Sequence, residues 1–143
     1  YGNGFNNLLE NAMKNARDGY ATIFGNQVKD PERFGIMELD ASNNVLSVEE
    51  KPKEPKSDYA VTGYYIFDKT VFNRISWLKY SDRGELEVTD LNMIYVNSNR
   101  MIAYVLDKND YWTDAGTFKS YQYANELMKW KKKKVGKPTF FVS

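Results

Sequence analysis

An acid and a base stand side by side at the end of an apolar run, where Glu50 is followed by Lys51 and then by Pro52. The ammonium of Lys51 could neutralise a phosphate and the carboxylate of Glu50 could accept hydrogen bonds from hydroxyl groups, because charged partners make the stronger hydrogen bonds. Pro52 restricts the backbone of the residue before it. A strand end whose charges simply face water would also explain the pair. The chemistry that the pair could serve is the binding of a sugar phosphate.

Gly35 and Arg83 could contribute to the same kind of site. Without a Cβ atom, Gly35 could let a ligand touch the backbone, although a glycine between a turn and a strand can also serve a positive φ. Arg83 precedes the acidic stretch 84–90 and could reach a phosphate. The acids of that stretch also fit the start of a helix, where the helix dipole favours negative charge. Each feature taken singly therefore has a structural explanation beside the functional one.

Asp114 is the candidate metal ligand, in the segment 112–117. Mg²⁺ in nucleotide enzymes is held by one or two carboxylates together with substrate phosphates, and Asp114 could supply one of them. It could equally cap the helix that follows. The lysines within residues 129–134 suggest anion binding, but cations at a helix C-terminus, which the dipole favours, explain them better.

The composition narrows the chemistry, because the 143 residues include neither histidine nor cysteine. The commonest general base and all thiolate metal sites are thus excluded, and a reducing compartment is permitted. What is left is carboxylates, lysine, arginine, tyrosine, backbone groups and hard metals. Phosphoryl and nucleotidyl transfer fit these groups, because such reactions depend on positioning and charge neutralisation.

The net charge and the hydropathy give no support for nucleic acid or a membrane as a partner. A net charge of +1 gives no global electrostatic case for nucleic acid or for a membrane surface. No apolar run reaches membrane-spanning length, and no signal-peptide pattern opens the chain. Because the first residue is Tyr1 and not methionine, we expect the sequence to begin inside a longer protein or after processing.

The elements that must position these residues alternate between helix and strand. Helices are predicted over 4–18, over 69–78, from a cap at Thr89 or Asp90 to about 96, and from 114–117 to about 134. Strands are predicted over 20–28, 35–39, 45–50, 59–67 and 101–106, the second and third forming a hairpin around 41–44. Neither a repeat nor a linker divides the chain. This order predicts a single α/β unit with a mixed sheet.

A series of motifs in this chain resembles a known family. The motifs lie at residues 27–35, 49–57, 60–65, 83–90 and 112–117. In this order and spacing they are similar to the second half of the catalytic domain of the sugar-1-phosphate nucleotidyltransferases, and among these to the glucose-1-phosphate thymidylyltransferases. The resemblance runs from Tyr1 to about Leu127.

The resemblance implies a fold and a reaction. The expected fold is α/β, the mixed-sheet, Rossmann-like nucleotide-diphospho-sugar transferase fold, here as a partial domain in which residues 1–143 are the sugar-binding half and the nucleotide-binding half is absent. The implied reaction joins dTTP and glucose 1-phosphate to give dTDP-glucose and pyrophosphate, with Mg²⁺ as charge neutraliser. The resemblance further implies a cytoplasmic homo-oligomer that serves the dTDP-rhamnose pathway.

The resemblance also implies roles for single residues. Gly35, Glu50 and Val61 would line the sugar pocket with Phe34, Lys51 and Arg83 would bind phosphate, Asp114 would be the second Mg²⁺ ligand, and Trp112 would pack beside it. Three positions depart from the usual family pattern, in which tyrosine, threonine and histidine are common where this chain has Phe34, Ala115 and Phe118. The first departure removes one hydroxyl donor near the sugar.

Other functions stay open on the sequence. The nucleotide could be UTP or CTP, or the chain could belong to a non-catalytic regulatory relative. A nucleic-acid-binding module would rest on the lysine tail alone. Because half of the phosphate clamp and one metal ligand of the family have no counterpart here, we expect the 143 residues to have no appreciable activity alone, and we expect an exposed apolar sheet edge to favour association.

Overall fold

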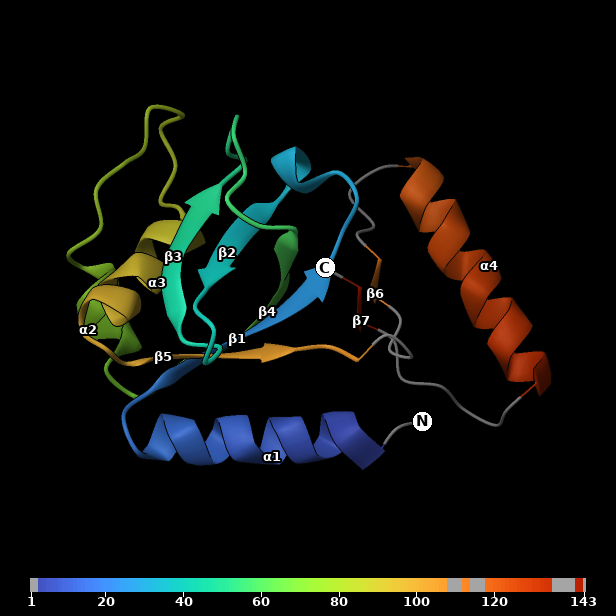
Figure 1. Cartoon of the computed structure of the whole chain (residues 1–143), viewed down its shortest axis with the longest axis horizontal. Coiled ribbons are helices and arrows are strands. Elements are labelled where there is room, and N and C mark those ends of the chain that lie inside the picture. The colour runs from blue at the N-terminus through green and yellow to red at the C-terminus, as the bar shows by residue number, and fades with distance from the viewer. Residues whose placement is uncertain (1–2, 108–111, 114–117, 135–140, 143) are drawn as a thin grey trace.

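A five-stranded mixed sheet, flanked by helices, forms the centre of the computed structural model (Figure 1). The structure describes residues 3–107, 112–113, 118–134 and 141–142. Its elements are α1 (Asn3–Arg17), β1 (Ala21–Gln27), the 3-10 turn η1 (Pro31–Arg33), β2 (Gly35–Leu39), β3 (Val45–Glu50), β4 (Tyr59–Ile66), α2 (Val71–Ile75), α3 (Val88–Asn97), β5 (Met101–Val105), β6 (Trp112–Thr113), α4 (Phe118–Lys134) and β7 (Phe141–Val142).

The strand order confirms the predicted mixed α/β fold. The strands lie in the order β3-β2-β4-β1-β5. Strand β1 pairs with β5 in parallel and with β4 antiparallel, while β2 pairs antiparallel with both β3 and β4. A strand with a parallel partner on one side needs cover on both faces, which is why the run from Ala21 onward is apolar.

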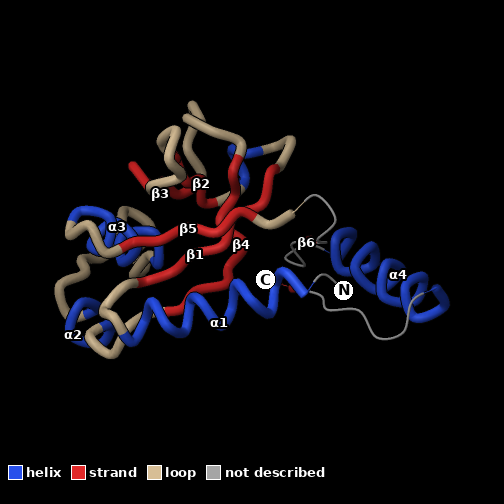
Figure 2. Tube along the Cα trace, turned by 60° about the horizontal axis from the view of Figure 1, so that its bottom comes forward, coloured by secondary structure: helices blue, strands red, loops and turns tan. Residues whose placement is uncertain are grey.

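Successive side chains of β1 point to opposite faces of the sheet and enter different clusters. Phe24 packs with Ala12 of α1 and with Leu106. Ile23 packs with Met37, Val48 and Val61, against which Met93 and Val96 of α3 also pack. Helix α1 therefore covers one face of the sheet and α3 the other, as Figure 2 shows from a second direction.

The predicted hairpin is confirmed and its register matters for the site. The Asp40 carboxylate accepts backbone hydrogen bonds from Ser42 and Asn44, each at 2.8 Å, and so closes the turn. The pairing of the two strands that follows sets Gly35 of β2 directly opposite Glu50 of β3. The glycine and the acid singled out in the sequence are therefore neighbours.

Two helix boundaries differ from the prediction. The helix expected over 69–78 spans only Val71–Ile75. Phe72 within it and Trp77 after it are 80% and 66% exposed, so little packing extends the helix. Helix α3 begins after Glu87 and not after Thr89 or Asp90. The hydroxyl of Thr89 donates a hydrogen bond to Glu50 and does not cap the helix, which explains the difference.

The chain also contains a short pairing that the sequence did not predict. Strands β6 and β7 pair in parallel, with Trp112 opposite Phe141. Each has only two residues, too few for a periodic pattern to be read from the sequence. Within the part of the chain that the structure describes, no helix is long and apolar enough to cross a membrane.

Candidate functional site

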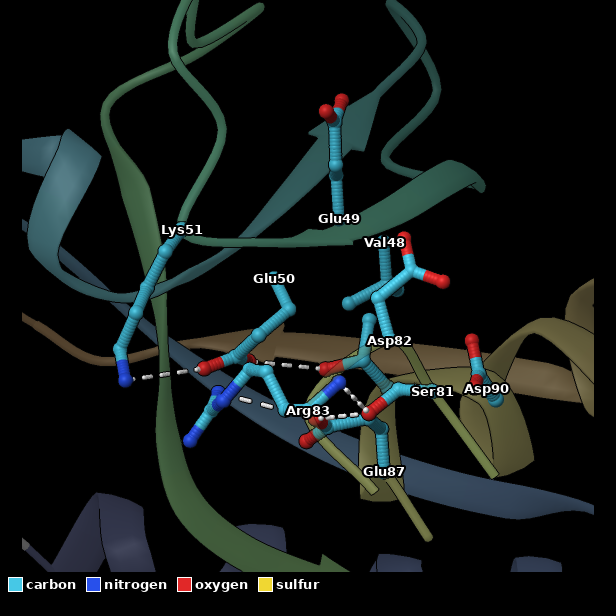
Figure 3. A pocket seen from close by; sticks show the side chains of 10 residues that line it. Val48, Glu49, Glu50, Lys51, Ser81, Asp82, Arg83, Glu87 and Asp90 are labelled. Atoms are coloured by element: carbon cyan, nitrogen blue, oxygen red, sulfur yellow. Dashed lines mark hydrogen bonds and ion pairs between the residues drawn. The ribbon is translucent and has the colours of Figure 1, made fainter. Parts of the chain in front are cut away.

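The end of β3, the start of α3 and the loop before α3 enclose a cleft of about 440 Å³ (Figure 3). This volume falls in the usual range of small-molecule sites. The cleft is lined by apolar, hydroxyl and charged side chains: Val48, Glu49, Glu50, Lys51, Ser81, Asp82, Arg83, Glu87, Thr89 and Asp90. The structure thus brings together Glu50, Lys51 and Arg83, which the sequence analysis had placed in one site.

The two oxygens of the Glu50 carboxylate have different surroundings. Oε2 accepts a hydrogen bond of 3.0 Å from the hydroxyl of Thr89, while Oε1 lies 3.6 Å from the ammonium of Lys51. The side chain of Glu50 is 30% exposed. One oxygen is therefore held in place by the protein, and the other is beside a half-exposed cation at the cleft.

Gly35 makes room for this arrangement. A Cβ atom on Gly35 would lie 3.2 Å from Oε2 of Glu50 and 3.7 Å from the hydroxyl oxygen of Thr89. The backbone of Gly35 does not have a positive φ, which is found at Gly19, Gly63 and Gly84. Close approach, and not backbone conformation, therefore explains why a glycine fits here, and the groups that approach are Glu50 and Thr89.

Lys51 has an unusual backbone conformation with a φ of 44°. This left-handed region is uncommon for a residue with a side chain and is often kept at functional sites. Its backbone N–H donates a hydrogen bond of 3.0 Å to the carbonyl of Phe34. The chain thus turns sharply where β3 ends, with the side chain of Lys51 beside Glu50.

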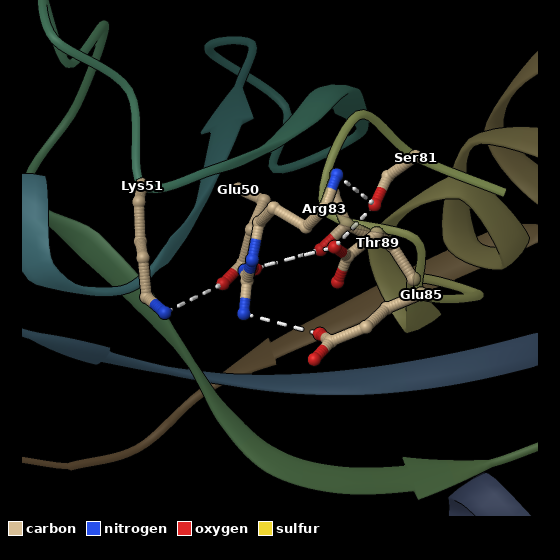
Figure 4. Close-up of polar contacts among 7 residues, drawn as sticks. Glu50, Lys51, Ser81, Arg83, Glu85 and Thr89 are labelled. Atoms are coloured by element: carbon tan, nitrogen blue, oxygen red, sulfur yellow. Dashed lines mark hydrogen bonds and ion pairs between the residues drawn. The ribbon is translucent and has the colours of Figure 1, made fainter.

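Arg83 is held by acids of its own loop (Figure 4). One guanidinium nitrogen, Nη2, lies 3.1 Å from Glu85 Oε2, and the other, Nη1, lies 3.6 Å from Glu87 Oε1. The same oxygen of Glu87 accepts a hydrogen bond of 3.0 Å from Ser81. The charge of Arg83 is therefore available to a ligand only in competition with these carboxylates.

Phe34 and Trp112 contact each other outside this cleft. Their ring centroids are 5.4 Å apart with the planes at 68°, and the indole N–H of Trp112 donates a 3.0 Å hydrogen bond to the carbonyl of Thr62. The hydrogen bond from Lys51 to Phe34 connects this aromatic pair to the cleft. Val61 is 8% exposed and packs in the core, so its place in a sugar pocket stays a prediction.

The metal site cannot be assembled from the residues that the structure places. Asp114 lies outside the described residues. Among those described, no group of three or more histidine, cysteine or acidic side chains could hold a metal ion. The role of Mg²⁺ therefore stays a prediction from the resemblance.

Thr89 is the main site residue that sequence analysis did not identify. In the sequence Thr89 is a candidate helix cap, and 39 residues separate it from Glu50. Tyr65 does not line the cleft but responds to its charge: burial, and then the charge of Glu50, raise the pKa of the Tyr65 hydroxyl to about 12. Neither the contact of Thr89 with Glu50 nor the effect of Glu50 on Tyr65 can be read from a local sequence pattern. Each depends on how the strands and α3 pack together.

A buried network fixes the helix that carries Thr89. Tyr95 on α3 donates a 2.5 Å hydrogen bond to Asp68, which also accepts one of 2.9 Å from Thr70. Burial acts to raise the pKa of the Asp68 carboxyl, but the hydrogen bonds from Tyr95 and Thr70 outweigh it and the pKa is lowered. Burial, and then the hydrogen bond to Asp68, raise the pKa of Tyr95 to about 12.

Comparison with proteins of known sequence places the chain among relatives of one kind. Over 124 residues it is 45% identical to a glucose-1-phosphate thymidylyltransferase of Neisseria gonorrhoeae, covering 87% of this chain and 42% of that protein. It is 41% identical over 124 residues to a protein of the same name from Xanthomonas campestris pv. campestris, strain B100, with 87% of this chain and 41% of that protein covered. The chain therefore spans less than half the length of these relatives.

Solved structures agree in fold. A structure described as a Bacillus anthracis glucose-1-phosphate thymidylyltransferase in complex with sucrose has a TM-score of 0.75 and 38% identity, covering 93% of this chain and 50% of that one. A UDP-glucose pyrophosphorylase complexed with UDP-glucose has a TM-score of 0.73 at 22% identity, over 88% of this chain and 49% of that one, and shows the fold alone. Residues 1–130 match the model of the family described as nucleotidyl transferase. The chain therefore belongs to the nucleotidyl transferase family.

Proposed function

We propose that the cleft binds the sugar-phosphate substrate of a nucleotidyl transfer, with glucose 1-phosphate as the sugar phosphate and dTTP as the nucleotide. The observation that carries the proposal is the Glu50 carboxylate, with one oxygen held by Thr89 at 3.0 Å and the other 3.6 Å from the Lys51 ammonium. This pairing offers an acceptor for sugar hydroxyls beside a cation for phosphate. The names of the relatives at 41–45% identity support the same substrates.

The proposed reaction needs charge neutralisation more than proton transfer. A phosphate oxygen of the sugar phosphate attacks the α-phosphorus of the nucleotide, the new P–O bond forms, and the bond to the β-phosphate breaks as pyrophosphate leaves with the electron pair. The attacking oxygen is already largely ionised at pH 7, since the second pKa of a phosphate monoester is about 6. No general base is required, which agrees with a chain that contains no histidine.

The chain's own side chains would divide the work. Lys51 and Arg83 would lie against the phosphate of the sugar and lower the repulsion between it and the nucleotide. Glu50, oriented by Thr89, would accept hydrogen bonds from the sugar hydroxyls. Asp114 would hold Mg²⁺, whose chemistry would be to neutralise charge on the nucleotide phosphates.

The 143 residues would supply the sugar-phosphate half of the active site. The relatives are longer, and the chain covers 42% of the Neisseria gonorrhoeae protein. We expect the isolated chain to bind glucose 1-phosphate and to release little pyrophosphate. The full protein would act as a homo-oligomer.

The direct test is calorimetric titration of the chain with glucose 1-phosphate. Saturable binding that is weakened in both Glu50→Gln and Lys51→Met would support the proposal. Glu10→Gln and Lys14→Met on α1, outside the cleft, are matched controls that should leave binding unchanged. Equal binding by all five proteins would overturn the assignment of the cleft.

The choice of nucleotide is tested in the full-length protein that carries this chain. Pyrophosphate release is measured with glucose 1-phosphate and each nucleoside triphosphate in turn. Selective release with dTTP would support the thymidylyl reaction, and selective release with UTP or CTP would keep the mechanism but change the nucleotide. Absence of release with every nucleotide would favour the regulatory, non-catalytic alternative.

A further inference from the structure

The guanidinium of Arg83 meets two carboxylates that the proposed reaction does not use. Glu85 lies 3.1 Å from one of its two terminal nitrogens (Figure 4). Glu87 lies 3.6 Å from the other (Figure 3). A phosphate that binds Arg83 in a bidentate manner would use these same two terminal nitrogens. In this state the cation predicted to hold phosphate is therefore already neutralised.

The two acids differ in how they are held. The Glu87 side chain is 16% exposed, and its Oε1 also accepts the 3.0 Å hydrogen bond from Ser81. The Glu85 side chain is 59% exposed, and its carboxylate has no second partner among the residues that the structure describes. Glu87 is thus part of the wall of the cleft, whereas Glu85 can leave Arg83 by rotating into water.

We propose that Glu85 is a built-in competitor for phosphate at Arg83 and thereby sets the affinity of the cleft for phosphorylated sugars. A ligand phosphate displaces the Glu85 carboxylate from the Nη2 edge of Arg83, while Glu87 stays bound to Nη1 and positions the guanidinium. This inference rests on the proposed function, because it assumes that the ligand phosphate reaches Arg83.

The balance of charges favours this exchange. A phosphate monoester carries a charge near −2 at pH 7 and three acceptor oxygens, against a single charge on Glu85. A sugar without phosphate carries no charge and cannot replace the carboxylate. The cleft also holds Glu49, Asp82 and Asp90, so an anion that does not gain Arg83 meets net repulsion.

The exposed Arg83–Glu85 pair can be overcome at modest cost. Side chains that are 51% and 59% exposed form a pair of the solvent-screened kind. Removing such a pair corresponds to a change of roughly one-and-a-half- to fivefold in an equilibrium constant. Glu85 therefore sets the affinity for phosphate without abolishing it.

The test compares Glu85→Gln with Glu87→Gln in the 143-residue chain by calorimetric titration. Glu85→Gln should bind glucose 1-phosphate roughly one-and-a-half- to fivefold more tightly than the unchanged chain. Glu87→Gln should bind it more weakly, because Arg83 loses the acid that positions it. Glu10→Gln on α1 changes the net charge equally but lies outside the cleft, and should have no effect.

Two further titrations separate this inference from the proposed function. Inorganic phosphate, which needs no sugar contact, should also bind more tightly to Glu85→Gln, whereas glucose should bind both proteins alike. If both phosphate ligands bind Glu85→Gln as tightly as the unchanged chain or more weakly, the proposal that Glu85 competes with phosphate is overturned. If phosphate responds to Glu85→Gln but glucose 1-phosphate does not bind the unchanged chain, the proposed function fails and the competition at Arg83 stands.

Thermal unfolding of each variant controls for a change in the folded state. Because the pair is exposed, Glu85→Gln should melt within a few degrees of the unchanged chain. The ¹⁵N signal of the Arg83 guanidinium then reports the contact directly. It should shift when phosphate is added to the unchanged chain, where one anion replaces another, and shift more in Glu85→Gln, where the Nη2 edge gains an anion. The absence of any shift on saturation would overturn displacement at Arg83.

Discussion

At the scale of single residues, the Glu50 carboxylate connects three features that are far apart in the sequence. Thr89 holds one of its oxygens, Lys51 lies beside the other, and Gly35 leaves the space in which the first contact forms. None of these contacts is strong alone. Together they restrict the rotation of Glu50, and we expect the affinity for the sugar to depend on that restriction.

Thr89→Val tests the hydrogen bond that holds Oε2 of Glu50 in place. The substitution keeps the shape of the side chain and removes the hydroxyl that donates to Glu50. A lost hydrogen bond to a charged group that is partly exposed should cost about 1 kcal/mol, or about fivefold in the dissociation constant for glucose 1-phosphate. Calorimetry measures it, with Thr89→Ser as the control that keeps the hydroxyl; equal losses in both variants would contradict the role of the hydrogen bond.

Gly35→Ala tests whether the space beside Gly35 is needed for Glu50 to reach Thr89. The added Cβ would lie 3.2 Å from Glu50 Oε2, the end of a flexible side chain, so Glu50 should move and the fold should change little. We expect the affinity for glucose 1-phosphate to fall severalfold while the free energy of unfolding changes by less than about 1 kcal/mol. Gly84→Ala is the opposite case, since nothing lies within 4 Å of its added Cβ but its φ is +72°. That variant should lose stability, so an equal effect of the two substitutions on stability would be evidence against close approach at Gly35.

The backbone of Lys51 gives a third prediction. Because its φ is 44°, glycine should be better accommodated there than alanine, by about 1 kcal/mol in the free energy of unfolding. Urea unfolding of Lys51→Gly and Lys51→Ala measures the difference, and both variants should lose affinity for glucose 1-phosphate because both lack the ammonium. Lys53→Gly and Lys53→Ala, at a position without a positive φ, are the matched pair that should not show this preference.

At the scale of elements, α3 links the cleft to the sheet. Its first turn presents Thr89 to Glu50, and its C-terminal half places Tyr95 against the buried Asp68, which follows β4. The start of α3 was not predictable, because the hydroxyl that usually caps a helix is used for a contact with β3. The strands were predictable, since their apolar runs reflect burial between α1 and α3.

Tyr95→Phe tests the anchor of α3. Removing the phenol leaves the buried Asp68 with one donor fewer and should lower the free energy of unfolding by about 1 to 3 kcal/mol at pH 7. The lowered pKa of Asp68 means that its stabilisation is present above its usual value of 3.8 and is lost as the pH falls through the folded-state pKa. Urea unfolding at pH 7 and near pH 3 should therefore show a smaller difference between the two proteins at the lower pH. A difference independent of pH would mean that the phenol acts through packing alone.

At the scale of the whole molecule, the sequence allowed the sheet and the position of Glu50, Lys51 and Arg83 to be predicted better than the pairing of distant segments. Strands β6 and β7 have two residues each and carry no periodicity. The ion pairs of Arg83 with Glu85 and Glu87 were also not predictable from the sequence. An acidic stretch before a helix has the same sequence pattern whether its acids face water or an arginine. Such relations depend on loop geometry, which local preferences do not determine.

Self-association is the prediction that belongs to this scale. Strand β5 has β1 as its one sheet partner among the described strands, and Val105 at its end is 38% exposed. An open edge next to a parallel pair is a surface on which a second copy can add, and lysine on such an edge opposes this. Light scattering of the chain should therefore give a mass above that of a monomer, and Val105→Lys should lower it.

Strand β3, the other edge of the sheet, supplies the control for that experiment. It packs against α3, and Leu46 on it is 51% exposed, so Leu46→Lys adds the same charge to an edge that a helix already accompanies. We expect Leu46→Lys to leave the mass unchanged. A monomeric chain at every concentration would contradict association, and an equal decrease in both variants would show that added charge, and not the β5 edge, controls it.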